Sequence, residues 1–344
     1  MRKHWIDYLR VIAILAVIFI HSSTSFYSRF NQIGPPDWWL ANLLNSASRF
    51  AVPLFVMISG ALLLGRNETI GGFYRKRAIR LLPAIIVWNL FYAGLNIGID
   101  VYNGIDAKNL TWHLWELFAA GGAAVHLWYL SMFLCLMLFT PFLNMYIIGD
   151  EPGSADLKII LVLMFVLFFL NGISNVAWEV WDVEIIWFKV FPWYIAYFIG
   201  GYYLDQYSDN IAVNSSFILL FIACLILSGA FLNYYFLTTY KIIEDNLIFI
   251  NTGPVVFLIT VLIFLLAKKN RSALHHNKYI TKIAEASFGM YLVHPVFLHI
   301  LQNKLPMYYS YGLIYLPLTI IITTIASLYS IIILRKLSLM RKIC

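Results

Sequence analysis

Long apolar runs alternate with short polar segments along almost the whole chain. A helix needs about 20 largely apolar residues to cross a hydrocarbon core about 30 Å thick. The pattern therefore predicts an all-α integral membrane protein with about ten transmembrane helices. The predicted spans lie near residues 8–27, 49–65, 80–99, 127–148, 157–174, 186–204, 213–236, 247–267, 283–302 and 312–334. Because the segments between them are short, we expect one membrane domain to fill residues 1–344.

Composition indicates a surface that faces lipid. Of the 344 residues, 61% are hydrophobic and 12% are charged, whereas a soluble domain carries about 25% charged residues. A net charge of +7 would suggest nucleic acid as the partner of a soluble protein. Here the basic residues gather between the apolar runs, so we expect a bilayer and no nucleic acid. Cys135, Cys224 and Cys344 are spaced neither for a metal site nor for a disulfide framework.

The distribution of lysine and arginine predicts the orientation, because cytoplasmic loops retain these residues. With the predicted spans and a cytoplasmic N-terminus, eighteen of the 24 basic residues fall in cytoplasmic segments. Both termini are therefore predicted to be cytoplasmic. The run from Val11 to Ile20 follows Arg2 and Lys3, a pattern that also fits a signal peptide. No small-residue cleavage site follows it cleanly, so we expect the first span to be retained.

Two ionisable residues on the first predicted span are the main candidates for chemistry, because such side chains within a membrane usually indicate function. Arg10 and His21 are eleven residues apart, which places them on one helix face about 16 Å apart along the axis. Asp7 can pair with Arg10 as an i,i+3 neighbour. Burial favours a neutral imidazole, which is able to take a proton from a hydroxyl. The structural alternative is that Arg10 reaches the interface and His21 bonds to Ser22 or Thr24.

A basic run precedes the third predicted span and contains Arg75, Lys76, Arg77 and Arg80. Arg77 and Arg80 are i,i+3 neighbours on a beginning helix, an arrangement able to clamp a pyrophosphate or a 3′-phosphate. Arg75, Arg77 and Arg80 are therefore candidate donor-binding residues. The alternative is ordinary anchoring of a span at the cytoplasmic interface.

Five further residues at predicted span edges are candidates for substrate contacts: Arg49, His126, Tyr129, Tyr291 and His294. Arg49 is predicted to lie on the same side of the membrane as His21. For His126 and His294 the alternative is a structural role, with Trp128 and Tyr291 in the interfacial aromatic belts. The chain has no nucleophile elbow, no P-loop, no dinucleotide fingerprint and no H-E-x-x-H motif. A metal enzyme or an ATP-driven pump is therefore disfavoured, and no metal cofactor is expected.

Four segments, found in this order, resemble the acyltransferase-3 family of membrane acyltransferases over essentially the whole chain. They are Arg10-x10-His21, Pro53-Leu54-Phe55-Val56-Met57-Ile58-Ser59-Gly60, Arg75-Lys76-Arg77-x-x-Arg80-x-x-Pro83 and Ser287-Phe288-Gly289-Met290-Tyr291-Leu292-Val293-His294. Trp5-Ile6-Asp7-x-Leu9-Arg10 and Asn45-Ser46-Ala47-Ser48-Arg49 look most like the branch that O-acetylates the enterobacterial common antigen.

The resemblance implies a multi-pass enzyme of the bacterial inner membrane. It implies acetyl-CoA as a donor that enters from the cytoplasm, and a hydroxyl of a cell-surface or lipid-linked glycan as acceptor. His21 matches the family's general base, Arg10 its partner arginine, and Arg77 and Arg80 the run expected to meet the CoA phosphates. Two other kinds of function stay open: a lipid or glycan flippase without chemistry, and an accessory scaffold of a glycan synthase.

Overall fold

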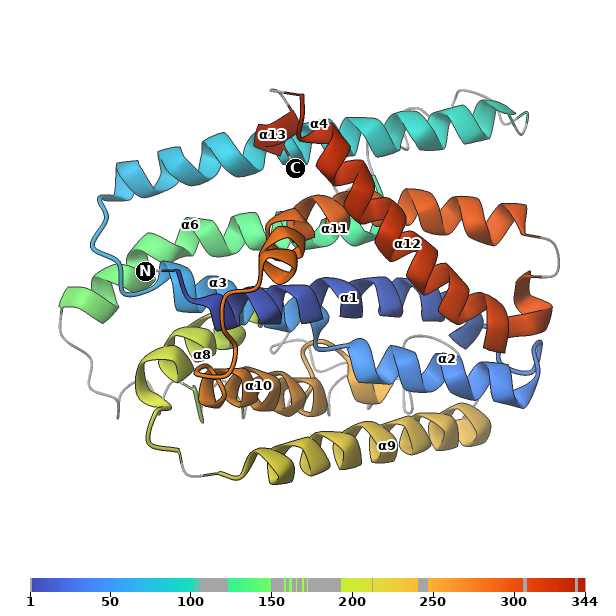
Figure 1. Ribbon diagram of the computed structural model, residues 1–344, viewed down its shortest axis with the longest axis horizontal. Helices are drawn as coiled ribbons and strands as arrows, with labels where there is room; N and C mark the ends of the chain where they lie inside the picture. The colour runs from blue at the N-terminus through green and yellow to red at the C-terminus, as the bar shows by residue number, and fades with distance from the viewer. Residues whose placement is uncertain are drawn as a thin grey trace. The chain divides into compact units, whose positions relative to one another are not determined.

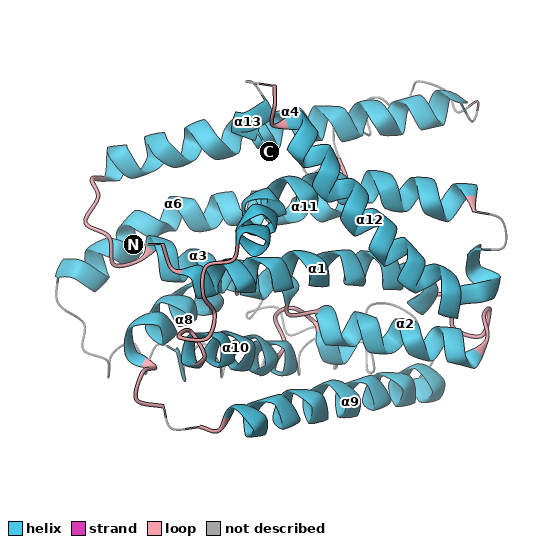
Figure 2. Ribbon diagram, viewed as in Figure 1, coloured by secondary structure: helices cyan, strands magenta, loops and turns pink. Residues whose placement is uncertain are grey.

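The computed structural model is all-helical over the residues that it describes (Figures 1 and 2). These residues are 2–102, 104, 123–149, 193–211, 213–240, 247–305, 308–337 and 340–343, with positions 158, 161, 162, 165, 169 and 172. The helices, in chain order, are α1 (His4–Tyr27), α2 (Pro35–Ser48), α3 (Ala51–Leu63), α4 (Ile70–Tyr102), η2 (Val125–Leu127), α6 (Trp128–Gly149), α8 (Tyr194–Tyr207), α9 (Ser215–Tyr240), η4 (Leu247–Phe249), α10 (Pro254–Lys269), α11 (Lys278–Lys304), η5 (Tyr308–Tyr311), α12 (Gly312–Leu334) and α13 (Met340–Ile343).

Seven helical segments among the described residues are long and apolar enough to cross a membrane. They are His4–Tyr27, Pro35–Leu63, Ile70–Tyr102, Val125–Gly149, Ser215–Tyr240, Lys278–Lys304 and Tyr308–Leu334. The predicted class, an all-helical multi-pass membrane protein, is confirmed. The total of ten spans stays a prediction. Most of the predicted span 157–174 and the first part of 186–204 lie outside the described residues.

The segment 28–48, which the sequence predicted as an outer loop, contains helix α2. Asn42, Asn45, Ser46 and Ser48 interrupt the apolar pattern of this segment, so the sequence did not predict a membrane-spanning helix here. All four side chains are buried in the protein. The Asn42 amide, for example, donates to the carbonyl of Ala230 on α9 at 3.0 Å. These polar residues therefore form contacts between helices, and the loop prediction was wrong.

Two further boundaries differ from the prediction. Helix α4 begins at Ile70, ten residues before the predicted span at 80–99, because the intervening lysine and arginines are good helix formers. Helix α10 begins at Pro254 and not at 247, where the short helix η4 lies. Pro254 occupies the first turn, a position that proline favours because its missing N–H would be unpaired there anyway.

The chain divides into two compact units. The first comprises Met1–Leu63 and Pro152–Tyr329, and the second Leu64–Glu151 and Ser330–Cys344. In the first unit, α1 packs against α2, α3, α10 and α11, so it is the central helix of that unit (Figure 1). In the second unit, α4 packs against α6 and α13.

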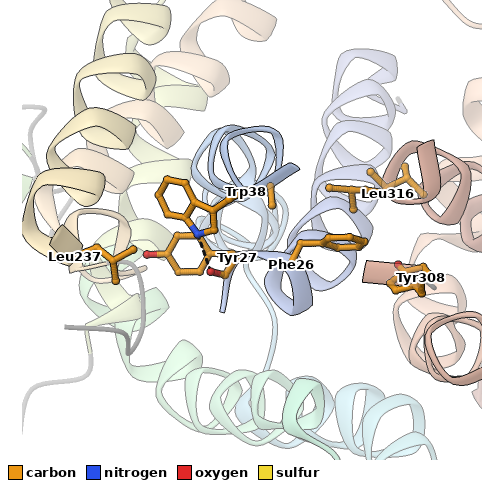
Figure 3. Packing of buried hydrophobic residues seen from close by; sticks show 8 residues of the cluster. Phe26, Tyr27, Trp38, Leu237, Tyr308 and Leu316 are labelled. Carbon is orange, nitrogen blue, oxygen red and sulfur yellow. Dashed lines mark hydrogen bonds between the residues drawn. The ribbon is translucent and has the colours of Figure 1, made fainter. Parts of the chain in front are cut away.

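A mainly aromatic core closes one end of the first unit (Figure 3). Trp38 of α2 stacks on Tyr27 of α1, with ring centroids 5.8 Å apart, and its indole N–H donates to the Tyr27 carbonyl at 2.9 Å. Phe26 meets Tyr308 on the other side of α1 at 5.0 Å between centroids. The buried indole has its hydrogen-bond partner, so this cluster fixes the end of α1 that carries His21.

Helices α3 and α8 approach each other through two glycines. A Cβ atom on Gly60 would lie 1.8 Å from the carbonyl oxygen of Phe198, and one on Gly201 would lie 1.9 Å from that of Met57. The absence of side chains at both positions therefore allows backbone-to-backbone contact. This is the close packing that small residues support in membrane helices.

Candidate functional site

An ion-pair cluster surrounds the start of α1. The buried Asp7 carboxylate accepts from Arg10 at 3.2 Å and from Arg2 at 2.8 Å. Arg2 also donates to Glu285 on α11 at 2.7 Å. The predicted Asp7–Arg10 pair is confirmed. The roles of Arg2 and Glu285 were missed, because nothing in the sequence indicates that the N-terminus meets α11.

Two imidazoles meet farther along the same helix pair. The rings of His21 on α1 and His294 on α11 have centroids 5.1 Å apart at an interplanar angle of 45°. His294 is fully buried, and its Nδ1 lies 2.7 Å from the Tyr291 carbonyl oxygen. Since a carbonyl oxygen only accepts, Nδ1 carries the hydrogen and Nε2 is the acceptor atom of that ring. The Tyr291 ring lies 6.2 Å from the His294 ring.

Arg49 is held beside the turn of α1 that carries His21. Its Nε donates to the Asn45 side-chain oxygen at 2.8 Å, and the Asn45 amide donates to Thr24 at 3.0 Å and to Ser23 at 3.3 Å. Arg49 is therefore held through Asn45 beside the turn of α1 that carries His21, and Asn45 is the positioning residue that the sequence did not single out.

Helices α1 and α11 run parallel. Arg2 contacts Glu285 near the starts of the helices, His21 contacts His294 farther along, and Gln302 donates to Ser25 at 3.2 Å near their ends. The charged cluster at Asp7 and Arg10 and the imidazole pair thus lie on the same two helices. By helix geometry, Arg10 and His21 are about 16 Å apart along α1. One helix pair therefore carries an ion-pair cluster near its start and two imidazoles in contact farther along.

The basic run belongs to the second unit and lies on the first turns of α4. Arg77 donates to Glu68 at 2.6 Å and lies over the Phe73 ring, 4.0 Å from its centroid. Lys76 pairs with the same carboxylate at 2.5 Å, and the hydrogen bond from Lys76 is the main reason why the pKa of Glu68 is lowered. Arg75 and Arg80 are exposed. A phosphate at Arg77 would therefore have to displace Glu68, whereas Arg75 and Arg80 face solvent.

His126 and Tyr129 also belong to the second unit. His126, in η2, is buried and meets the Tyr92 ring edge-on, with centroids 4.9 Å apart. Tyr129 is buried at the start of α6 and stacks on Phe133 at 5.6 Å. Both residues thus pack against aromatic rings, and their predicted substrate contacts stay predictions.

A family model described as an acyltransferase domain matches residues 3–334. The chain belongs to the acyltransferase-3 family. The helical, multi-pass architecture accords with membership of this family of membrane proteins. The match includes Arg10, His21 and the α4 arginines as well as the α11 segment that ends at His294.

The other comparisons add one distant relative. The chain is 32% identical over 130 residues to a protein of Enterococcus faecalis named an amino-acid racemase. That stretch makes up 36% of this chain and 16% of the other protein, so the racemase name describes a protein that is mostly outside the match. No solved structure matches this chain.

The structure brings together six of the predicted site residues within the first unit. Asp7 and Arg10 form one cluster, and His21, Arg49, Tyr291 and His294 form the other. An imidazole is a side chain that can accept or donate a proton near neutral pH. A guanidinium near a reacting carbonyl also stabilises negative charge that develops on oxygen.

Proposed function

We propose that this protein is an O-acetyltransferase of the bacterial inner membrane. It transfers acetyl from cytoplasmic acetyl-CoA to a hydroxyl of a cell-surface or lipid-linked glycan. The observation that carries the proposal is the His21–His294 ring contact beside Arg49, in a chain that belongs to a family of acyltransferases. A neutral imidazole held next to a cation and within a membrane helix suits acyl transfer to a hydroxyl.

His21 is the general base of the proposed reaction. It removes the proton from the acceptor hydroxyl while the oxygen attacks the thioester carbonyl. The C–O bond forms, the C–S bond breaks, and the CoA thiolate leaves. The proton on His21 then passes to the thiolate or to water, which restores the neutral imidazole. A general base of this kind contributes about 10²- to 10⁴-fold to the rate.

His294 and Arg49 support this step in different ways. His294 Nδ1 donates to the Tyr291 carbonyl, and this hydrogen bond holds the His294 ring in place against the His21 ring. Arg49, held by Asn45, supplies a positive charge that stabilises the oxyanion formed on the thioester carbonyl. His294 is therefore a positioning residue for His21, and Arg49 contacts the reacting group.

The donor is proposed to enter from the end of α1 that carries Asp7 and Arg10. Arg75 and Arg80 of α4 are the residues proposed to meet the CoA phosphates, because both are exposed. Arg77 joins them when phosphate displaces Glu68. Within the first unit, the thioester is proposed to reach His21 along α1, on which Arg10 and His21 are roughly 16 Å apart. Asp7 keeps the Arg10 guanidinium in a fixed place.

The proposed acceptor class is a glycan. It is supported by the resemblance of Trp5–Arg10 and Asn45–Arg49 to the branch that acts on the enterobacterial common antigen. Both stretches lie in the two clusters described above, since the first contains Asp7 and Arg10 and the second contains Asn45 and Arg49. Acetyl follows from the same resemblance; a succinyl donor would need similar machinery.

The test is binding and turnover of acetyl-CoA by the purified protein in detergent, with succinyl-CoA as a second donor. In His21→Ala we expect acetyl-CoA binding within about twofold of wild type and release of free CoA reduced by about 10²-fold or more. In Arg80→Ala we expect weaker binding of acetyl-CoA. His299→Ala is the matched control, because His299 is an exposed histidine on the same helix as His294.

Three outcomes would contradict the proposal. If His21→Ala and His299→Ala release CoA at equal rates, His21 is not the base. If succinyl-CoA is used and acetyl-CoA is not, the assignment of the acyl group is wrong. If wild type binds no acyl-CoA and a His21→Gln variant still moves glycan across the membrane, the protein acts as a flippase.

A further inference from the structure

A cavity of about 300 Å³ lies in the first unit, beside the end of α10 and the segment that leads into α9. It contains none of the residues of the proposed active site. Ile218 of α9 and Leu262 and Leu265 of α10 form its apolar wall. Its polar side is formed by the end of α10 and the residues that follow, among them Lys269 and Arg271.

The cavity carries an excess of positive charge. Lys268, Lys269 and Arg271 line it, and Asp209 is the carboxylate among the lining residues. Arg271 donates two hydrogen bonds, of 2.5 and 3.1 Å, to the Asp209 carboxylate. The Lys268 ammonium lies 3.4 Å from the same carboxylate. These bonds lower the pKa of Asp209, with that from Arg271 as the main cause, so the carboxylate is ionised at neutral pH. Three cations against one anion leave a net charge of about +2.

Lys269 is the cation that an incoming anion would meet. Its ammonium donates to the backbone carbonyl of Val213, a neutral acceptor, and it faces no carboxylate among the described residues. Lys268, by contrast, is buried and also donates to the Asp205 carbonyl at 2.5 Å. Asp205 in turn pairs with Lys3. Lys268 is thus part of the internal ion network, and the exposed Lys269 carries the unmatched charge.

The position of the cavity indicates what kind of anion it suits. Helix α9 is the most apolar of the seven candidate spans, and only 17% of its most apolar window is buried within the protein. Phe217, Leu219 and Leu220, next to the wall residue Ile218, are all exposed. The helix therefore faces lipid. A cavity with basic residues on one side and apolar residues on the other suits a phosphate that is attached to acyl chains.

We infer that this cavity binds the headgroup of an anionic phospholipid. The lipid phosphate lies against Lys269 and Arg271, and the glycerol and upper acyl chain lie against Leu262, Leu265 and Ile218. This binding site shares no residue with the proposed acyl-transfer site, and it does not depend on the proposed acetyl transfer. Basic pockets between membrane helices are recurrent sites for lipid phosphates.

The test is native mass spectrometry of the full-length protein in detergent, with phosphatidylglycerol added and phosphatidylcholine as the neutral lipid. For Lys269→Gln we expect about fivefold weaker binding of phosphatidylglycerol, the effect of about one charge near a membrane surface. Leu265→Trp, which fills the apolar side, is expected to lose binding while it keeps every charge. Lys282→Gln, an exposed lysine outside the cavity, is the matched control and is expected to bind as wild type does.

Competition separates a lipid site from a donor site. We expect neither free CoA nor inorganic phosphate at millimolar concentration to displace the lipid. Displacement by CoA would overturn the inference and assign the cavity to the donor. Equal binding of phosphatidylcholine, or equal phosphatidylglycerol binding by Lys269→Gln and Lys282→Gln, would overturn it as well. If Leu265→Trp does not fold, the comparison of the two lysine variants decides alone.

Discussion

The close approach of α3 and α8 gives a quantitative prediction for Gly60→Ala. The new methyl carbon would lie 1.8 Å from the carbonyl oxygen of Phe198, whereas ordinary contact begins at about 3.4 Å. The two helices would therefore have to separate by about 1.5 Å. No rotamer change relieves the clash, because the atom that it meets is backbone.

The expected loss of stability follows from two opposing terms. Overpacking of a tight contact costs about 1–3 kcal/mol, and a backbone clash of this size belongs at the upper end of that range. Alanine offsets up to about 1 kcal/mol, because it is a better helix former than glycine. A net loss of about 2 kcal/mol corresponds to a fall of about 4–8 °C in Tm for a domain of 150–250 residues. Gly201→Ala meets the Met57 carbonyl at the same crossing and should behave alike.

The assay is thermal unfolding of the purified protein in detergent, followed by tryptophan fluorescence. Gly94→Ala on α4 is the matched control, because a Cβ at that position would meet nothing within 4 Å. The control should leave Tm unchanged or raise it slightly. The double variant of Gly60 and Gly201 should lose less than the sum of the two single losses, since both widen one interface. A Gly60→Ala protein that melts at or above the wild-type temperature would refute the reasoning.

Three further substitutions test other contacts by the same unfolding assay. Asp7→Asn removes the charge that two guanidinium groups share and should cost about 2 kcal/mol; an unchanged Tm would show that this cluster does not stabilise α1. Asn233→Leu leaves the Tyr27 hydroxyl without its 2.7 Å donor and should cost about 1–3 kcal/mol, and a neutral effect would contradict that bond. Glu68→Gln should destabilise at neutral pH. Because Lys76 lowers the pKa of Glu68, its contribution is complete above the ordinary value of 4.5 and is lost as pH falls through the lowered value. The Tm difference between wild type and Glu68→Gln should therefore shrink below pH 4.5, and a constant difference would argue against the ion pair.

The sequence predicted what local patterns determine. Apolar runs of sufficient length predicted the helical, multi-pass class. The i,i+3 spacing of Asp7 and Arg10 predicted their ion pair. The sequence did not predict that α2 is a buried helix, because its buried face contains asparagine and serine residues. In water such residues favour turns, but within a membrane protein they join helices by hydrogen bonds.

Contacts between distant helices were beyond the sequence. His21 and His294 are 273 positions apart, and only the pairing of α1 with α11 brings their rings to 5.1 Å. From its position at the edge of a predicted span, His294 was predicted to contact the substrate. In the same way, Arg77 was expected to face a phosphate together with Arg80, yet Glu68 already pairs with it. Charge patterns indicate which residues attract ions but not which partner they have.

The parallel course of α1 and α11 predicts on which side their ends emerge. Because the two helices contact each other from Glu285 to Gln302 in the same direction, each crosses the membrane the same way. In the ten-span prediction they are the first and ninth spans, which also run in one direction. The basic residues near both starts predict that those starts are cytoplasmic.

Cysteine labelling in cells tests this arrangement, with the three native cysteines replaced by serine. Gln32→Cys follows α1 and Asn303→Cys lies at the end of α11, and both positions are exposed. A membrane-impermeant maleimide should label both in intact cells and should label Ser272→Cys, which precedes α11, only after the membrane is opened. Labelling of residues 32 and 303 from opposite sides would contradict the parallel pairing of α1 and α11. Labelling of both only from inside would keep the pairing but reverse the orientation, and the donor could then no longer enter from the cytoplasm at the Asp7–Arg10 end.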